Sequence, residues 1–261
     1  MKVFLGGARG SFPVSGEDTL KFGGETFALL IEGEDGTQLL VDAGSGVQRL
    51  RERLRPGATL LFTHTHLDHL IGLPALTECW PAVMVSPRGG LADVLERVFS
   101  PPVWPVRLPA AEFAMPSEPF AAGGLRVSWR EVAHPDGCVA YRVDEAAGGA
   151  SVVVATDIEW QAMTAEEQEG FVEFARGAGL VVFDGQFAPE EYGERRGWGH
   201  STWGDAVEVG GRCGAGRVWV VHHAPGRGDG ELEGMGRQVG MVAGGVEVVM
   251  AGSGAVWSCG G

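Results

Sequence analysis

Apolar residues in this chain occur mainly in short runs, which are separated by turns rich in glycine and proline. Residues 59–62 and 151–155 are such runs, and their length is typical of buried strands because helices usually need ten or more residues. By this criterion we expect strands at 2–5, 27–32, 38–44, 59–62, 83–85, 125–131, 139–144, 151–155, 180–183, 218–221 and 246–250. The last of these ranges is expected to be the final strand of the chain.

Helices are expected between several of these strands. Leu91, Val94, Leu95 and Val98 recur at helical spacing, which indicates a helix over 90–99 whose apolar face packs in the core. Further helices are expected at 47–55, at 68–77 with a disturbance at Pro74, at 164–175 with Thr164 as its cap, and at 205–212. The proline-rich residues 101–119 are interpreted as a long surface connection that could serve as a lid.

Polar residues repeatedly follow the apolar runs, at the point where a strand is expected to end. They are Asp42, His64, His134, Asp157, Asp184 and His222. Polar side chains that all leave a sheet from the ends of its strands form an active site at that edge. We therefore expect these residues to share one site.

The densest group of such residues is the sequence THTHLDH at 63–69. An extended backbone points His64 and His66 to the same side, and the turn that follows can bring Asp68 and His69 back toward them. Neutral imidazole and carboxylate groups are the ligands that suit zinc and similar divalent ions. A solvated loop has no need of three imidazoles at this spacing, so we predict a metal site here.

Length and charge limit the classes of function. A chain of 261 residues can build one large domain, and we expect 1–261 to form a single one. The formal net charge of −14 disfavours binding to nucleic acid or to an anionic membrane, since both require a basic surface. The N-terminus lacks an apolar stretch of signal-peptide length, and no segment reaches the length of a membrane span. We therefore expect a cytoplasmic protein.

Two further features of the sequence are expected to be structural. The four cysteines are too widely spaced for a zinc knuckle and are expected to be reduced, mostly buried thiols: Cys79, Cys138, Cys213 and Cys259. The glycine-rich residues 6–11 match neither of the common nucleotide-binding patterns. We interpret them as a loop at the rim of a site.

The sequence at 63–69 resembles the His-x-His-x-Asp-His signature of the metallo-β-lactamase superfamily. Later motifs come in a similar order, with a histidine at 134, an aspartate at 157 and a histidine at 222. The resemblance implies an α/β fold of the αββα sandwich type, in which two mixed β-sheets carry helices on their outer faces. It also implies a dinuclear site in which one ion takes His64, His66 and His134, the other takes Asp68, His69 and His222, and Asp157 bridges them.

Two divalent cations about 3.5 Å apart repel each other strongly and need negative groups between them. Asp157 can supply a carboxylate, and a bridging water with a lowered pKa can supply hydroxide, which is also the nucleophile. Zinc is the first expectation for both ions, with manganese and iron as alternatives. Asp42 can either orient a ligand histidine or cap the turn that follows it. His223 is expected to point away from the neighbouring His222.

The sequence GHST at 199–202 resembles an element of the ribonuclease Z and phosphodiesterase branch, in which the histidine works beside an acidic residue. Asp184 stands where that branch carries its acid. The resemblance implies that His200, held by Asp184, protonates the leaving oxygen. We therefore take Asp68, Asp184 and His200 as the catalytic residues. The alternative is that His200 is a structural cap near Asp184.

These residues favour a dinuclear hydrolase of a small phosphodiester, either cyclic or nucleotide-like. The chain has no obvious long arm of the kind that ribonuclease Z uses to grip transfer RNA, and its acidity opposes a structured nucleic acid. The expected partner is a small-molecule substrate, with no membrane and with formation of a homodimer left open. Two alternatives remain: hydrolysis of a carboxylic ester, thioester or lactone at the same metals, and a non-hydrolytic iron-binding sensor or redox protein.

Overall fold

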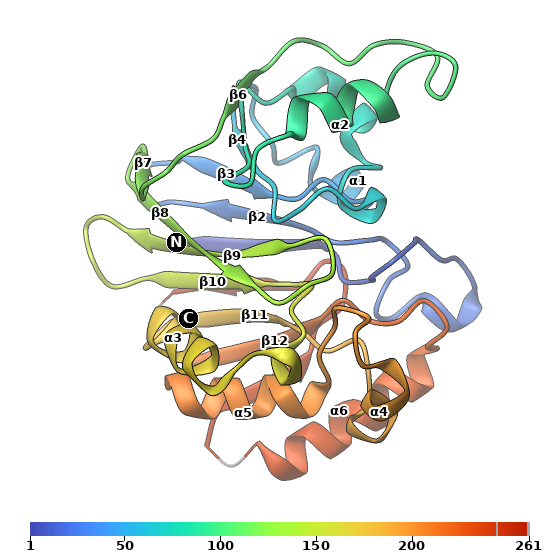
Figure 1. Cartoon of the computed structure of the whole chain (residues 1–261), viewed down its shortest axis with the longest axis vertical. Helices are drawn as coiled ribbons and strands as arrows, with labels where there is room; N and C mark the ends of the chain where they lie inside the picture. The colour runs from blue at the N-terminus through green and yellow to red at the C-terminus, as the bar shows by residue number, and fades with distance from the viewer. Residues whose placement is uncertain (244, 260–261) are drawn as a thin grey trace.

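Two seven-stranded β-sheets pack face to face, and helices cover the outer face of each sheet (Figure 1). The structure is a computed structural model that describes residues 1–243 and 245–259. The first sheet has the strand order β14 (Val256–Ser258), β1 (Lys2–Gly7), β2 (Ala28–Glu32), β3 (Gln38–Val41), β4 (Thr59–Leu61), β5 (Val83–Val85) and β6 (Glu112–Ala114). The second has the order β13 (Glu247–Met250), β12 (Arg217–Val221), β11 (Leu180–Asp184), β10 (Ser151–Ala155), β9 (Cys138–Glu145), β8 (Leu125–Val132) and β7 (Phe120–Ala122).

Both sheets are mixed, and the two share one arrangement. In the first sheet β14, β1, β2 and β3 are antiparallel neighbours, whereas β3, β4, β5 and β6 run parallel. In the second sheet β7, β8, β9 and β10 are antiparallel neighbours, whereas β10, β11, β12 and β13 run parallel. The prediction of an αββα sandwich with two mixed sheets is confirmed.

The apolar runs are continuous because both faces of each sheet are covered. In β2, Leu29 and Ile31 point into the layer between the sheets, whereas Leu30 packs against helices outside the first sheet. In β10, Val154 lies in the layer between the sheets and Val153 packs against helices outside the second. A strand that is covered on both sides has no solvent face, so its sequence does not alternate between apolar and polar residues.

The helices form the two outer layers. The first sheet is covered by α1 (Val47–Leu50), the 3₁₀ helix η3 (Leu73–Cys79) and α2 (Leu91–Val98). The second is covered by α3 (Ala165–Ala175), α5 (Trp203–Cys213) and α6 (Asp229–Val242). Shorter turns of helix are η1 (Glu17–Thr19), η2 (Leu67–His69), η4 (Trp160–Ala162), η5 (Pro189–Glu191) and α4 (Tyr192–Arg195). Thr164 caps α3 as expected, since its side chain accepts from the backbone N–H of Glu167. Within the described residues, no helix combines the length and the apolar character needed to cross a membrane.

The single helix expected over 68–77 is wrong, because the chain forms two short 3₁₀ helices there, η2 and η3. Gly72 separates them, since its N–H donates to the carbonyl of Ala43 on another segment. Pro74 then lies in the first turn of η3, where a missing N–H costs nothing. A Cβ on Gly72 would lie 2.1 Å from the carbonyl oxygen of Gly44, so the close approach of this segment to the end of β3 requires glycine.

Three short strands and the long helix α6 escaped the sequence pattern. Residues 101–119 contain β6, which pairs with β5 at the edge of the first sheet, and β7 follows at the edge of the second. The prediction that 246–250 is the final strand is wrong, because β14 follows it and pairs with β1. The helix α6 contains four glycines, which lower its intrinsic helix propensity. It is held instead by Leu232 and Val239, which are buried against the second sheet.

Candidate metal centre and active site

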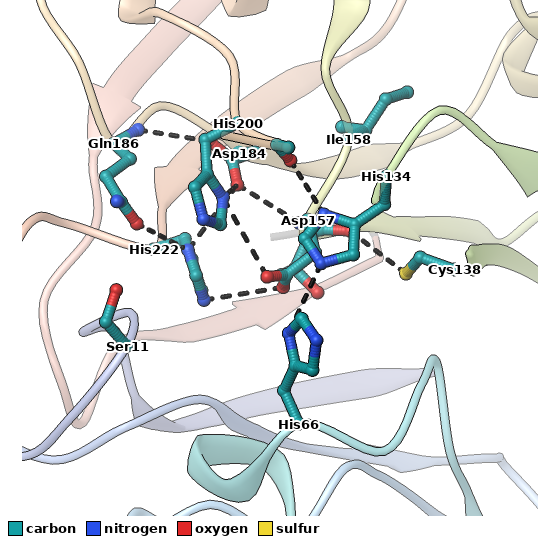
Figure 2. A network of polar contacts seen from close by, with 12 residues as sticks. Ser11, His66, His134, Cys138, Asp157, Ile158, Asp184, Gln186, His200 and His222 are labelled. Carbon is teal, nitrogen blue, oxygen red and sulfur yellow. Dashed lines mark hydrogen bonds and ion pairs between the residues drawn. The ribbon is translucent and has the colours of Figure 1, made fainter. Parts of the chain in front are cut away.

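The polar residues at the strand ends meet in one buried cluster at the edge of the two sheets. Figure 2 shows His66, from the segment after β4, pointing toward His134 and Asp157, which come from the second sheet. His222 and Asp42 directly follow their strands with left-handed φ angles of 62° and 57°, and Asp157 follows its strand one residue later with φ 54°. Residues other than glycine hold this conformation only where their surroundings fix it, and such residues gather at functional sites.

The residues predicted as metal ligands form three overlapping groups whose ligand atoms lie within 4.8 Å of one another: His64, His66 and His134; Asp68, His69 and His222; His64, His69 and Asp157. Asp157 lies between the first two groups. Its Oδ2 is 3.1 Å from Nε2 of His69 and 3.4 Å from Nε2 of His222, and its Oδ1 is 3.8 Å from Nε2 of His64. The structure thus brings all seven predicted ligands together.

Each of the five clustered histidines has one ring nitrogen turned outward to a hydrogen-bond partner at 2.9 to 3.1 Å. These partners are Thr63 Oγ1 for His64, Asp136 Oδ2 for His66, Asp42 Oδ2 for His69, the Gly199 carbonyl for His134 and Gln186 Oε1 for His222. All of them accept, including Thr63, whose hydroxyl donates to Asp42. In the neutral form of each ring the outer nitrogen therefore carries the proton, and the inner nitrogen keeps a lone pair directed into the cluster.

The inner atoms of the cluster lack partners of their own. Nε2 of His64, His69 and His222 and Oδ2 of Asp157 are buried without a hydrogen bond to any described residue. Nδ1 of His66 and Nε2 of His134 face each other at 3.3 Å, although both would be acceptors. Buried acceptors without a donor are costly unless a cation lies between them. The residues present therefore fit divalent metal ions, which imidazole and carboxylate ligands bind well.

The charge balance of the cluster agrees with this fit. Burial would raise the pKa of Asp157, but the neighbouring His222, His69 and His64 hold it well below its usual value. Burial opposes the charged form of Asp68 too, and there His69 and His222 keep the pKa low. For His69, burial would lower the pKa, but the carboxylates of Asp68, Asp157 and Asp42 raise it well above normal. The carboxylates thus stay ionised and require positive charge beside them.

His200 and Asp184 lie next to this cluster and form the expected pair. Nδ1 of His200 is 2.9 Å from Oδ2 of Asp184, and the His200 ring stacks on that of His222 with centroids 4.9 Å apart. Burial would lower the pKa of His200, but the Asp184 carboxylate more than offsets this effect and raises it to about 9. Asp184 is itself fixed by three backbone N–H groups, those of Asp157, Gln186 and Ser201.

The structure decides between the two roles considered for Asp42. Its carboxylate accepts from Nδ1 of His69 and from the backbone N–H and hydroxyl of Thr63, so it orients a clustered histidine. His223 points away from the cluster, as expected, and its Nε2 donates to the carbonyl of Ala251. Burial lowers the pKa of His223 to about 3, which keeps the ring neutral.

The glycine-rich residues 6–11 lie at the rim of the cluster. The backbone N–H of Ser11 donates to Oδ2 of Asp68 at 2.8 Å. A Cβ on Gly10 would lie 2.4 Å from the ring of His222, so this loop packs directly on a clustered histidine. These contacts agree with a loop at the rim of a site.

Several residues that support the cluster were not identified from the sequence. Asp136 and Gln186 hold the outer nitrogens of His66 and His222. Glu159 is buried and accepts from the backbone N–H groups of Gly197 and Gly199 and from the hydroxyl of Tyr192. Each of these contacts joins segments far apart in the chain, so no local pattern marks them. The one available signal was the position of Glu159, two residues after Asp157.

Comparison with known proteins gives matches over most of the chain. A family model described as a beta-lactamase superfamily domain matches residues 37–223. Ribonuclease Z from Agathobacter rectalis is 25% identical over 243 residues, which cover 73% of this chain and 80% of that protein. Ribonuclease Z from Clostridium kluyveri is 28% identical over 156 residues, covering 55% of this chain and 49% of its own length. The matched segment therefore spans about half of this second relative.

Solved structures share the fold over the whole described chain. The metallo-beta-lactamase fold protein YhfI from Bacillus subtilis superposes with a TM-score of 0.72, at 21% identity, covering 98% of each chain. A structure described as a new diphosphatase from the PhnP family also gives 0.72, at 17% identity, covering 98% of this chain and 96% of its own. The short form of human tRNase Z gives 0.68, at 19% identity, covering 99% of each chain.

Proposed function

Because the chain belongs to the metallo-β-lactamase superfamily and is a metal-dependent hydrolase resembling the ribonuclease Z and phosphodiesterase branch, we propose that it hydrolyses small phosphodiesters at a dinuclear metal site. The observation that carries this proposal is the pair of His200 and Asp184, joined at 2.9 Å beside the cluster. Zinc is the proposed metal, since the ligand set consists of imidazoles and carboxylates.

The ligand assignment follows the two groups of the cluster. We assign one ion to His64, His66 and His134, the other to Asp68, His69 and His222, and the position between them to Asp157. Divalent ions held there supply polarisation of a phosphoryl oxygen and activation of a water molecule. The outer hydrogen bonds of the five histidines fix their ring orientations and tautomers in advance, which reduces the cost of ordering the site when the substrate binds.

His200 supplies the proton that a phosphodiester needs. The alkoxide that leaves such an ester is poor unless it is protonated as the bond breaks. The Asp184 carboxylate holds Nδ1 of His200 and favours the charged form of the ring, so its Nε2 carries a proton available to a leaving oxygen. Asp184 is fully buried and its geometry is fixed by the backbone, so the proton is offered in one direction.

A small substrate suits the chain better than a folded RNA. The formal net charge of −14 opposes a polyanion, whose binding depends mainly on lysine and arginine contacts to phosphates. The one negative charge of a single phosphodiester has to be neutralised only at the metal site. We therefore propose a cyclic or nucleotide-like ester as the substrate.

The test is a panel of substrates assayed with zinc, manganese or iron(II) added to metal-free protein. The panel contains bis-p-nitrophenyl phosphate, cyclic nucleotides, lactones and thioesters. We expect hydrolysis of the phosphodiesters, and activity confined to the carbonyl substrates would overturn the proposal. Metal bound without any hydrolysis would instead support a sensor or redox protein.

The variant His200→Gln separates the role of the proton from that of the metals. We expect a loss of roughly 100-fold with cyclic nucleotides, whose leaving group is an alkoxide, and a much smaller loss with bis-p-nitrophenyl phosphate. The nitrophenolate leaves without a proton, so it serves as the internal control. Equal losses on both substrates would show that His200 is only structural.

A further inference from the structure

A pocket of about 210 Å³ adjoins the metal cluster beside His64 and His66. Its walls come from the loop between β5 and α2 and from the turn between β8 and β9. The lining residues are His64, Thr65, His66, Ser86, Arg88, Gly89, Asp136 and Gly137. Since two predicted metal ligands form part of its wall, the pocket lies within reach of an ester group of a phosphodiester bound at the cluster.

Arg88 is the only lysine or arginine among these lining residues. Its Nη1 lies 3.3 Å from Oε1 of Glu131, and its Nη2 lies 3.5 Å from the carbonyl oxygen of Asp136. Both contacts are long, and the Glu131 side chain is 75% exposed. An ion pair of this kind contributes little, so a substrate anion can replace it at small cost.

The backbone around Arg88 is shaped to hold the side chain over the pocket. Gly89 and Gly90 both have left-handed φ angles, 74° and 72°, which turn the chain sharply after Arg88. Gly137 has φ 76°, and a Cβ there would lie 2.2 Å from Cζ of Arg88. The guanidinium therefore rests directly on the backbone of the opposite turn, in a position that any side chain at 137 would block.

The remaining polar groups of the pocket leave donors free. The hydroxyls of Thr65 and Ser86 take part in no hydrogen bond between described side chains, and Ser86 is buried, with 4% of its surface exposed. Asp136 is the acidic residue among the lining residues, and its Oδ2 is already paired with Nε2 of His66 at 3.0 Å. The groups of the pocket that can meet an anion are thus the two hydroxyls and the Arg88 guanidinium, which has to leave Glu131 to do so.

We propose that Arg88, with the hydroxyls of Ser86 and Thr65, forms a subsite for a second phosphate group carried by the substrate. This inference rests on the proposed phosphodiesterase function and narrows its substrate to a phosphodiester with a further phosphate on the adjoining alcohol. A guanidinium offers paired donors in a plane, which match two phosphate oxygens. This subsite strengthens binding of the substrate and does not change which bond is cleaved at the cluster.

The test compares two substrates that share one scissile bond. They are the p-nitrophenyl ester of thymidine 5′-phosphate and the same ester with a phosphate on its 3′-hydroxyl. With zinc-loaded protein we expect kcat/KM to be at least roughly tenfold higher for the phosphorylated ester, mainly through KM. In Arg88→Ala we expect kcat/KM to fall much more for the phosphorylated ester than for the plain one, so that the preference disappears, and Arg88→Lys should keep part of it.

Two further variants serve as controls. Arg107→Ala removes an exposed arginine that pairs with Glu96 outside the pocket, and it should keep the preference. Gly137→Ala should abolish the preference as Arg88→Ala does, because its Cβ displaces the guanidinium. A binding measurement by calorimetry, with thymidine 3′,5′-bisphosphate and thymidine 5′-phosphate, should show the same loss for Arg88→Ala without any turnover.

The outcomes separate the subsite from the function on which it rests. Hydrolysis of both esters without a preference, or a preference that survives Arg88→Ala, would overturn the subsite and leave the phosphodiesterase intact. Equal losses on both esters in Arg88→Ala would show that Arg88 only supports the structure. Failure to hydrolyse either ester or bis-p-nitrophenyl phosphate would overturn the proposed function itself.

Discussion

The carbonyl oxygen of Gly199 lies 3.0 Å from Nδ1 of His134, on the side of the ring that faces away from the cluster. Gly199 has a left-handed φ of 85°, and a Cβ there would lie 2.2 Å from the same nitrogen. This residue therefore both orients the histidine and makes room for it. Because Gly199 precedes His200, one short segment sets the position of a predicted metal ligand and of the predicted acid.

We predict that Gly199→Ala weakens metal binding at the group formed by His64, His66 and His134. The added methyl group must displace the His134 ring, and loss of an orienting partner typically costs about 10- to 100-fold in metal affinity. Competition against a zinc-binding dye, with metal content per protein, measures the change. Gly193→Ala is the matched control, since Gly193 has no atom near its missing Cβ. Unchanged zinc affinity in Gly199→Ala would contradict the assignment of His134.

Glu159 is predicted to hold this segment in place. One of its oxygens accepts from the Gly199 N–H at 2.8 Å, and the other accepts from the Gly197 N–H at 2.7 Å and from the Tyr192 hydroxyl at 2.8 Å. Glu159→Ala leaves both backbone groups without a partner, so we expect weaker zinc binding as well as lower stability. Tyr192→Phe removes only one donor and should cost about 1 kcal/mol of unfolding free energy.

The two variants are compared by denaturant unfolding and by zinc titration. A role limited to stability would make them differ only in the unfolding free energy. We expect zinc affinity to fall in Glu159→Ala alone, because only that change frees the Gly199 segment that orients His134. Loss of zinc affinity in Tyr192→Phe as well would show that the whole α4 region, and not the carboxylate, positions the site.

Metal removal is predicted to destabilise the protein through the unpartnered atoms of the cluster. Three histidine nitrogens and one oxygen of Asp157 are buried without a donor, so binding of cations to the folded state alone adds stability. At free zinc about 1,000 times its Kd the gain should be about 4 kcal/mol per site, measured by unfolding with and without a chelator.

Asp157→Ala should lose at least one ion and nearly all activity, and retention of both ions would show that the bridging position is misassigned.

Much of this site was predictable because its residues form recognisable patterns over short stretches of sequence. The sequence at 63–69 and the polar residues after the strands need only the direction of an extended chain and the common edge of parallel strands to bring them together. The partners that fix them are different. Asp136 meets His66 across 70 residues of chain, and Gln186 meets His222 across 36. No spacing rule links such pairs, and the contact of Gly199 is made by a carbonyl that every residue has.

The same limit explains the elements that were missed. The strand β14 has three residues and exists because Trp257 lies opposite Val3 in the first sheet, a pairing between the two ends of the chain. The helix α6 carries four glycines and is helical because its apolar side packs on the second sheet. In both, tertiary contact decides a conformation that local propensity does not favour.

Asp42 is predicted to set the tautomer of His69. Its Oδ2 accepts from Nδ1 of His69 at 2.9 Å and from the Thr63 hydroxyl at 2.7 Å, and its Oδ1 accepts from the Thr63 N–H at 2.8 Å. Asp42 is fully buried with φ 57°, a conformation that asparagine also tolerates. Asp42→Asn therefore keeps the backbone conformation and the shape of the side chain. It replaces one accepting oxygen with an NH₂ group, which cannot accept from the donors of His69 and Thr63.

We expect Asp42→Asn to lower zinc affinity about 10- to 100-fold at the group of Asp68, His69 and His222, since His69 can no longer keep its proton on Nδ1. Thr63→Val and Thr63→Ser form the matched pair. The Thr63 hydroxyl donates to Asp42 and accepts from His64. Valine removes this hydroxyl whereas serine keeps it, so only Thr63→Val should weaken zinc binding. Zinc titration monitors affinity, and denaturant unfolding of the metal-free variants checks that each one folds. Two ions bound by Asp42→Asn with unchanged affinity would mean that burial alone, without this carboxylate, orients His69.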